Sequence, residues 1–286
     1  MVYLLLSVFF STSLFVIFKY FEKYKVNTLQ AIVVNYLVAF GLGMFSANTF
    51  NKLATIPSQQ WVYGAMLLGL LFILIFFVMA ITAQKNGVAV ASVAGKMSVV
   101  VPIIFGIVLY KESVTTLKVI GIIIALVAVY LSSVKEEKEK TSAGLLFPTL
   151  LFLGSGIIDT TIKYVETNFV KVNDVDFFSG SLFGFAAIFG ILILLAQQFS
   201  SPQKLEFKNV LAGIALGIPN YYSIVFLIKA LQNKGIESST LFTINNVGVV
   251  VVSTIVGFFL FKEYFSIKNK IGVALAILGI ILVTIA

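Results

Sequence analysis

The 286-residue sequence contains no cysteine and no histidine. Without cysteine there are no disulfides and no thiolate chemistry, and without both residues the commonest ligands of zinc, haem and copper are missing. We therefore expect no metal site and no cofactor. Charged residues are also scarce, at 11% against roughly 25% in an ordinary soluble domain. A membrane enzyme would need clustered carboxylates, histidines or a nucleophile with its base, and the sequence does not provide them. We therefore predict no catalytic residues, and we consider a membrane enzyme the weakest of the alternative functions.

Two further absences narrow the function. No nucleotide-binding motif of the Walker A kind is present, so nothing in the chain supports ATP-driven work. The net charge is +8, but the lysines are scattered through short loops, which argues against a nucleic-acid partner.

The first stretch, MVYLLLSVFFSTSLFVIF, has neither a positive start nor a small-residue cleavage site. We expect it to be a retained membrane helix rather than a signal peptide.

Long apolar runs dominate what is present, and 59% of the residues are hydrophobic. A run of about 20 apolar residues is enough to cross a bilayer core of about 30 Å as a helix. The sequence therefore predicts an all-α integral membrane protein with about ten transmembrane helices in the lipid bilayer. We expect the spans near residues 2–18, 29–46, 62–83, 88–109, 116–133, 144–162, 176–196, 209–230, 238–261 and 267–285.

The two halves of the chain resemble each other. We predict a first five-helix repeat over 1–134, a charged linker loop over 135–143 and a second five-helix repeat over 144–286. Because each repeat has an odd number of spans, the second must enter the membrane from the opposite side, and the repeats are inverted. Three sets of matches support the alignment: Lys19, Tyr20 and Glu22 with Lys163, Tyr164 and Glu166; Gly87 with Gly235; and Lys111, Glu112 and Gly121 with Lys262, Glu263 and Gly272.

These motifs resemble the drug/metabolite transporter superfamily, in particular its EamA-like ten-helix members. The resemblance rests on two five-helix units whose fourth helix ends in a Lys-Glu pair, each followed by a glycine-rich fifth helix, VIGIIIALVAVYL and KIGVALAILGIIL. It covers essentially the whole chain. It implies a cell-membrane transporter that works by alternating access, with a small metabolite as substrate and both termini in the cytoplasm. Inverted repeats of this kind place a substrate site near the bilayer midplane.

The distribution of lysine disagrees with the implied orientation. By the positive-inside rule, the lysine-rich set of loops faces the cytoplasm, which would put both termini outside. The loops after the odd-numbered spans carry twelve lysines: 19, 23, 25, 85, 135, 138, 140, 204, 208, 262, 268 and 270. The other loops carry seven: 52, 111, 118, 163, 171, 229 and 234.

Lys96 is the most unusual residue within a span. It lies about 8 residues into its helix, or roughly 12 Å from the membrane face. A charge at bilayer depth costs about 2.5–3.5 kcal/mol on insertion scales, and such residues usually face the bundle interior. We expect Lys96 to line a cavity and attract an anionic or carboxylated group, with snorkelling to the interface as the alternative. Asp159, the acid deepest in any span, is as well explained by a position near the interface.

Other polar residues fall near mid-depth by the same count. An amide in hydrocarbon needs a partner, so each could bind substrate or join helices. Pro102 and Pro219 are predicted to break or kink their helices, and GIPNYYS at 217–223 could line the substrate path or form a simple kink. The predicted substrate-binding residues are Lys96, Asn35, Ser155, Asn220, Tyr221, Asn245 and Asn246.

The sequence thus predicts a secondary transporter with a central cavity between inverted repeats. A channel or a non-transporting membrane scaffold is the alternative from another class. Small residues spaced by four in each fifth helix, such as Gly121 with Ala125 and Gly272 with Ala276, suit close helix packing and a homodimer through these helices.

Overall fold

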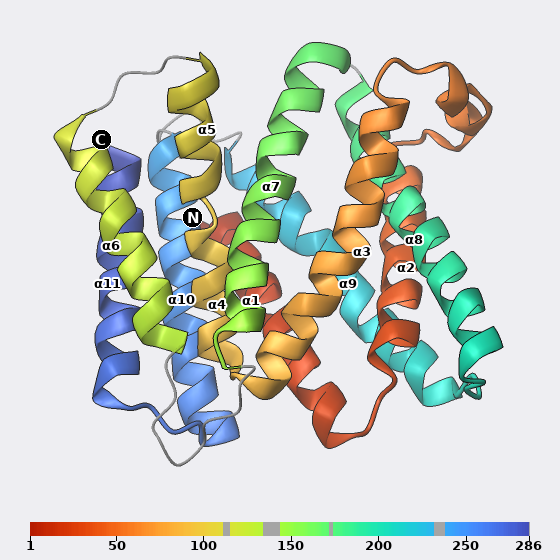
Figure 1. Cartoon of the computed structure of the whole chain (residues 1–286). Helices are drawn as coiled ribbons and strands as arrows, with labels where there is room; N and C mark the ends of the chain where they lie inside the picture. The colour runs from red at the N-terminus through yellow and green to blue at the C-terminus, as the bar shows by residue number, and fades with distance from the viewer. Residues whose placement is uncertain (111–114, 134–143, 172–173, 232–237, 286) are drawn as a thin grey trace. The chain divides into compact units, whose positions relative to one another are not determined.

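The computed structural model describes residues 1–110, 115–133, 144–171, 174–231 and 238–285 (Figure 1). Lys111, Glu112, Gly235 and the predicted linker 135–143 lie outside this described part. Within it the secondary structure is helical. The helices are α1 (Val2–Lys23), α2 (Thr28–Ser46), η1 (Phe50–Ser58), α3 (Val62–Lys85), α4 (Val88–Met97), α5 (Val100–Tyr110), α6 (Thr116–Ser133), α7 (Leu146–Phe169), α8 (Val175–Ser200), α9 (Phe207–Leu231), α10 (Ser238–Phe261) and α11 (Ile267–Ile285).

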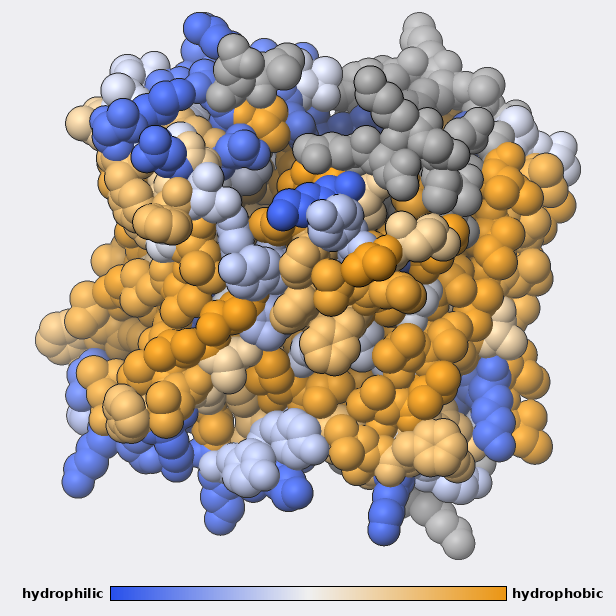
Figure 2. Space-filling model, turned by 180° about the vertical axis from the view of Figure 1, so that it is seen from behind, coloured by the Kyte–Doolittle hydropathy of each residue, from blue (hydrophilic) through white to orange (hydrophobic). Residues whose placement is uncertain are grey.

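The number of membrane spans agrees with the sequence. Among the described residues, nine segments are long and apolar enough to cross a bilayer, and α4 and α5 together form one of them. The 19-residue α11 supplies the tenth helix. On the face shown in Figure 2, hydrophobic side chains cover most of the coloured surface. This is the distribution expected of an all-α membrane protein.

The helices form two compact units that interleave along the chain. Unit 1 comprises Met1–Tyr20, Val78–Ile157 and Tyr222–Ala286, and unit 2 comprises Phe21–Phe77 and Ile158–Tyr221. Each unit therefore contains segments from both predicted repeats. Aliphatic and small side chains of α4, α6, α10 and α11 fill the core of unit 1. The core of unit 2 combines aliphatic side chains with an aromatic group in which Trp61 packs edge-on against Phe177 and Phe178.

Helices with matching places in the two repeats pair within the units. In unit 1, α4 packs against α10. The Ser92 and Ser253 hydroxyls lie 2.5 Å apart, and the Val88 N–H donates to Glu263 at 2.8 Å. Residue numbers rise along α4 while they fall along the facing segment, so this pair is antiparallel.

The two fifth helices, α6 and α11, also lie side by side and antiparallel in unit 1 (Figure 1). The Asn269 amide donates to the Ser132 carbonyl at 2.8 Å, and a Cβ added at Gly279 would lie 3.3 Å from the Ala125 nitrogen. A Cβ added at Gly272 would overlap the Ser132 backbone. The sequence predicts a homodimer through the small residues of the fifth helices. In the structure, the small residues of α6 and α11 instead contact each other within one chain.

In unit 2, α2 and α8 form the third pair. A Cβ added at Gly43 would lie 3.4 Å from the Gly180 Cα, and one added at Gly190 would lie 2.7 Å from the Val33 side chain. This register is again antiparallel. In each of the three pairs, two helices with the same place in their repeats run antiparallel to each other. This is the arrangement expected of inverted repeats.

Candidate functional site

The predicted amides of unit 2 bind each other. Asn35 of α2 and Asn220 of α9 are buried, and the Asn220 Nδ2 donates to Asn35 Oδ1 at 3.1 Å. The Asn35 Nδ2 lies 3.4 Å from the Ile32 carbonyl. Gly217 allows the close approach, since a Cβ there would lie 2.8 Å from the Asn35 carbonyl oxygen. The amides thus satisfy each other in an apolar environment, as buried polar groups must.

Tyr221 and Pro219 flank this pair on α9. The Tyr221 side chain is half-buried, and its ring faces α2 at Gly43. Pro219 lies inside α9, which continues from Phe207 to Leu231. The sequence predicts that this proline breaks or kinks its helix, and the structure keeps one helix across it, so a break is excluded. A proline removes its own N–H from the hydrogen-bond pattern and its ring crowds the carbonyl four residues earlier, which here is Ala215, yet the helix continues on both sides of it.

The predicted amides of unit 1 lie on α10. Asn245 is buried, and its Oδ1 accepts a hydrogen bond from the Ser7 hydroxyl of α1 at 2.9 Å. Ser7 Oγ also lies 3.0 Å from the Ser223 carbonyl oxygen. Asn246, the next residue, is half-buried. Asn245 therefore joins helices, whereas Asn246 retains accessible surface.

Lys96 lies in the last turn of α4, immediately before an interruption of the span. α4 ends at Met97 and α5 begins at Val100, so the interruption falls at Ser98 and Val99 rather than at Pro102 itself. A proline ring clashes with the carbonyl four residues earlier, which here is Ser98. The C-terminal end of α4 carries partial negative charge that favours a nearby ammonium. The Lys96 side chain is half-buried there.

Ser155 is a half-buried residue of α7 in unit 1. Asp159, on the same helix, has an exposed side chain. α7 continues to Phe169, seven residues beyond the predicted end of the span, and this places Asp159 near the middle of the helix. Among the described residues, no group of three or more acidic side chains could hold a metal ion.

The structure divides the predicted site residues between the two units. Unit 1 holds Lys96, Ser155, Asn245 and Asn246, and unit 2 holds Asn35, Asn220 and Tyr221. The structure joins one predicted pair by a hydrogen bond, Asn35 with Asn220.

Three polar features were not among the predicted site residues. Ser7 and the Ser92–Ser253 pair are buried in apolar helices, and isolated serines carry no distinctive sequence signal. Glu263 was found as half of a repeated Lys-Glu motif, but its partner is 175 residues away in sequence. Only the fold could identify that partner.

Glu263 caps α4, the helix that carries Lys96. Its carboxylate accepts from the Val88 N–H at the first residue of the helix, just after Gly87, whose φ of 105° lies in the left-handed region. Side chains at Gly87 or Gly257 would collide with this carboxylate. Burial raises the pKa of Glu263, while the Val88 hydrogen bond, the Lys19 charge and the Ala89 N–H act in the opposite direction. Glu263 lies beyond Phe261, the last residue of its span.

Comparisons with known proteins agree with this architecture. Residues 1–134 match the model of the EamA-like transporter family, and residues 113–286 match that of the family described as Sugar transport protein. A solved crystal structure has the same fold, with a TM-score of 0.59 at 14% sequence identity. The similarity covers 99% of this chain and 96% of the solved one.

Two relatives illustrate the range of similarity. An uncharacterized protein of Haemophilus influenzae is 26% identical over 97% of this chain and 95% of its own length. A Bacillus cereus protein named "Putative sugar uptake protein" is 26% identical over 59% of each chain. The second family model covers more than half of the sequence. The chain therefore belongs to the Sugar transport protein family and, with its EamA-like first half, is a membrane transporter of the drug/metabolite transporter superfamily.

Proposed function

We propose that this protein is a secondary active transporter of the cell membrane that moves a small sugar-like metabolite by alternating access. The observation that carries the proposal is the antiparallel pairing of equivalent helices, α2 with α8, α4 with α10 and α6 with α11. Inverted repeats provide two related arrangements that open a midplane site to opposite sides. We place that site between the repeats, which we delimit as 1–134 and 144–286. We propose no enzymatic activity.

A sugar-like substrate is supported by two kinds of observation. The family model over residues 113–286 and the name of the Bacillus relative both refer to sugars. The proposed contact residues are mostly neutral hydrogen-bonding groups: an amide at Asn246, a hydroxyl at Ser155 and a phenol at Tyr221. Amides and hydroxyls donate and accept, which suits a ligand rich in hydroxyl groups.

Burial separates proposed contacts from proposed supports. Lys96, Ser155, Asn246 and Tyr221 are half-buried, and we assign them to the substrate. Asn35, Asn220 and Asn245 are buried and hydrogen-bonded to other side chains, and we assign them to positioning the helices. The interruption beside Lys96 and Pro102 would place non-helical backbone along a substrate path, which is tolerated where a cavity is lined.

The half-buried ammonium of Lys96 supports a second candidate substrate, an anionic or carboxylated metabolite. The two candidates predict different results from one experiment. Purified protein would be heated with a panel of sugars, polyols, amino acids and carboxylates, with Lys96→Gln tested beside the wild type. A ligand that binds the folded state raises the melting temperature according to its concentration and affinity.

We expect sugars or polyols to stabilise both proteins, because neutral groups supply most of the contacts. Stabilisation by a carboxylate that is lost in Lys96→Gln would favour the anionic substrate instead. If no member of the panel stabilises the wild type while its fold and melting transition are intact, the assignment of a small polar metabolite fails.

A further inference from the structure

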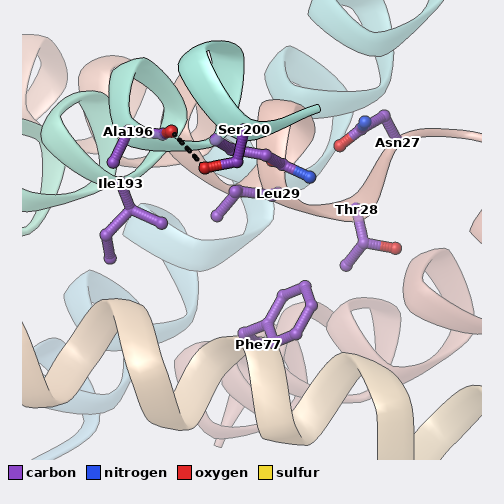
Figure 3. A pocket seen from close by; sticks show the side chains of 8 residues that line it. Asn27, Thr28, Leu29, Phe77, Ile193, Ala196 and Ser200 are labelled. Carbon is purple, nitrogen blue, oxygen red and sulfur yellow. Dashed lines mark hydrogen bonds between the residues drawn. The ribbon is translucent and has the colours of Figure 1, made fainter. Parts of the chain in front are cut away.

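Unit 2 contains a surface groove that the proposed transport function does not use. It lies between the start of α2, the middle of α3 and the end of α8, and has a volume of about 590 Å³. Figure 3 shows Phe77 and Thr28 on the side opposite Ala196 and Ser200. We call this the α2–α8 groove. Its lining residues are Asn27, Thr28, Leu29, Phe77, Ile193, Ala196, Gln197 and Ser200.

The groove has an apolar part and a polar end. Leu29, Phe77 and Ile193 offer hydrocarbon surface on segments that cross the membrane. Asn27 and Ser200 place polar side chains, which are hydrogen-bonded within the chain, where α2 begins and α8 ends. A ligand that fits both parts has an apolar tail and a polar head.

The polar end is built by hydrogen bonds between the 27–30 segment, where α2 begins, and the 203–209 segment, where α9 begins. The Asn27 side chain bonds to Gln203, and the Asn27 N–H donates to Asn209 Oδ1 at 3.0 Å. The Asn209 amide donates to Gln30 at 2.6 Å, and the Gln30 amide donates to the Lys204 carbonyl at 3.2 Å. These contacts hold the start of α2, and with it the preceding 24–27 segment, against the 203–209 segment, beside the groove.

Each of the two segments carries an exposed lysine, Lys25 and Lys204. Neither side chain forms a salt bridge with any described residue, whereas the neighbouring Lys208 is paired with Glu206 at 2.7 Å. Two exposed positive charges therefore lie on the segments that flank the polar end of the groove. Such charges beside a membrane attract anionic lipids, each contributing about 1 kcal/mol.

We propose that the α2–α8 groove binds an anionic phospholipid of the surrounding bilayer. One acyl chain would lie against Leu29, Phe77 and Ile193, and the phosphate would lie between Lys25 and Lys204. Charge complementarity selects the anionic headgroup, and burial of apolar area retains the tail. The inference is independent of the transported substrate.

The test measures lipid binding by native mass spectrometry of the purified chain with phosphatidylglycerol or phosphatidylcholine of identical acyl chains. We expect the wild type to prefer phosphatidylglycerol. Lys25→Gln combined with Lys204→Gln should weaken that binding roughly 30-fold, equivalent to about 2 kcal/mol, and leave phosphatidylcholine unaffected. The matched control is Lys268→Gln with Lys270→Gln, which removes two exposed lysines of unit 1 and should keep the wild-type preference.

A second variant addresses the tail. Ala196→Phe would fill the groove from α8 and should weaken binding of both lipids alike, with the lysines intact. The proposal is overturned if the wild type does not discriminate between the lipids, if the control variant loses as much as the test variant, or if Ala196→Phe binds as the wild type does. Equal competition by glycerol 3-phosphate, which has the charge but no tail, would also overturn it.

Discussion

At the scale of single residues, burial separates two kinds of polar side chain in the membrane spans. The buried amides Asn35, Asn220 and Asn245 are each hydrogen-bonded to another side chain. Asn246 is half-buried beside Asn245 on the same helix. Because an unsatisfied amide in an apolar environment is costly, the buried residues are expected to serve stability, and the half-buried one is free to serve function.

The neighbouring asparagines give a matched pair of variants. Asn245→Ala removes the acceptor of the Ser7 hydroxyl and should lower the free energy of unfolding by about 0.6 kcal/mol and by no more than about 1.7 kcal/mol, the average and the maximum for interhelical hydrogen bonds in membranes. Asn246→Ala should leave the melting temperature near that of the wild type and lower substrate flux. Thermal unfolding and flux measured on both variants test this. Normal flux in Asn246→Ala would remove that residue from the proposed site.

Glu263 provides a pH-dependent prediction. Burial raises its pKa in the folded state, so the folded protein binds the proton more tightly than the unfolded chain does. Between the unfolded and the folded pKa, the unfolded state holds fewer protons, and the free energy of unfolding therefore falls as the pH rises. Glu263→Gln can still accept from the Val88 N–H but cannot ionise, so the corresponding fall in melting temperature should disappear.

The control for this prediction is Glu206→Gln, which alters an exposed carboxylate paired with Lys208. Its melting temperature should follow the wild-type pH dependence in the acidic range. The described environment of the carboxylate is wrong if the melting temperature of Glu263→Gln changes with pH as that of the wild type does. It is also wrong if the wild type, compared with Glu263→Gln, becomes more stable as the pH rises through this window.

At the scale of helices, glycine determines how closely equivalent elements approach. Gly272 of α11 meets the backbone of α6 at Ser132, where a side chain has no space. Gly41 of α2 has nothing within 4 Å of its Cβ position. The same substitution at these two positions therefore tests the observed packing of α6 on α11.

We expect Gly272→Ala to lower the free energy of unfolding by about 1–3 kcal/mol, the usual cost of overpacking. Gly41→Ala should be neutral or stabilising by about 0.4–1 kcal/mol, because alanine restricts the unfolded chain and suits a helix. Thermal unfolding of both variants in the same detergent provides the comparison. Equal effects at the two positions would show that α6 and α11 do not pack as described.

At the scale of the whole molecule, most of the architecture can be predicted from hydropathy. Apolar runs of bilayer length locate the spans to within a few residues, since the membrane fixes the length of each helix. The ends are less well predicted, because α1 continues to Lys23 and α7 to Phe169 through polar residues. These helices do not stop where the hydrophobic residues stop, since helical hydrogen bonding continues outside the bilayer.

The candidate site was less predictable than the spans. A count along a helix gives depth, and depth drew attention to Asn35 and Asn220, but it does not give direction around the helix axis. The hydrogen bond between them joins residues 185 positions apart, and the bond from Val88 to Glu263 joins residues 175 positions apart. Such partners depend on tertiary packing, which an amide or a carboxylate in the sequence does not specify.

The central claim is that the whole chain moves a sugar-like solute by alternating access. The most direct test is counterflow in proteoliposomes that contain the purified protein, with a radiolabelled sugar outside and the same unlabelled sugar inside. We predict saturable entry of label that is accelerated by internal sugar, because a site that alternates exchanges one bound molecule for another. Flux that rises linearly with concentration and is indifferent to internal sugar would indicate a channel, and the absence of flux for all sugars tested would contradict the proposed substrate class.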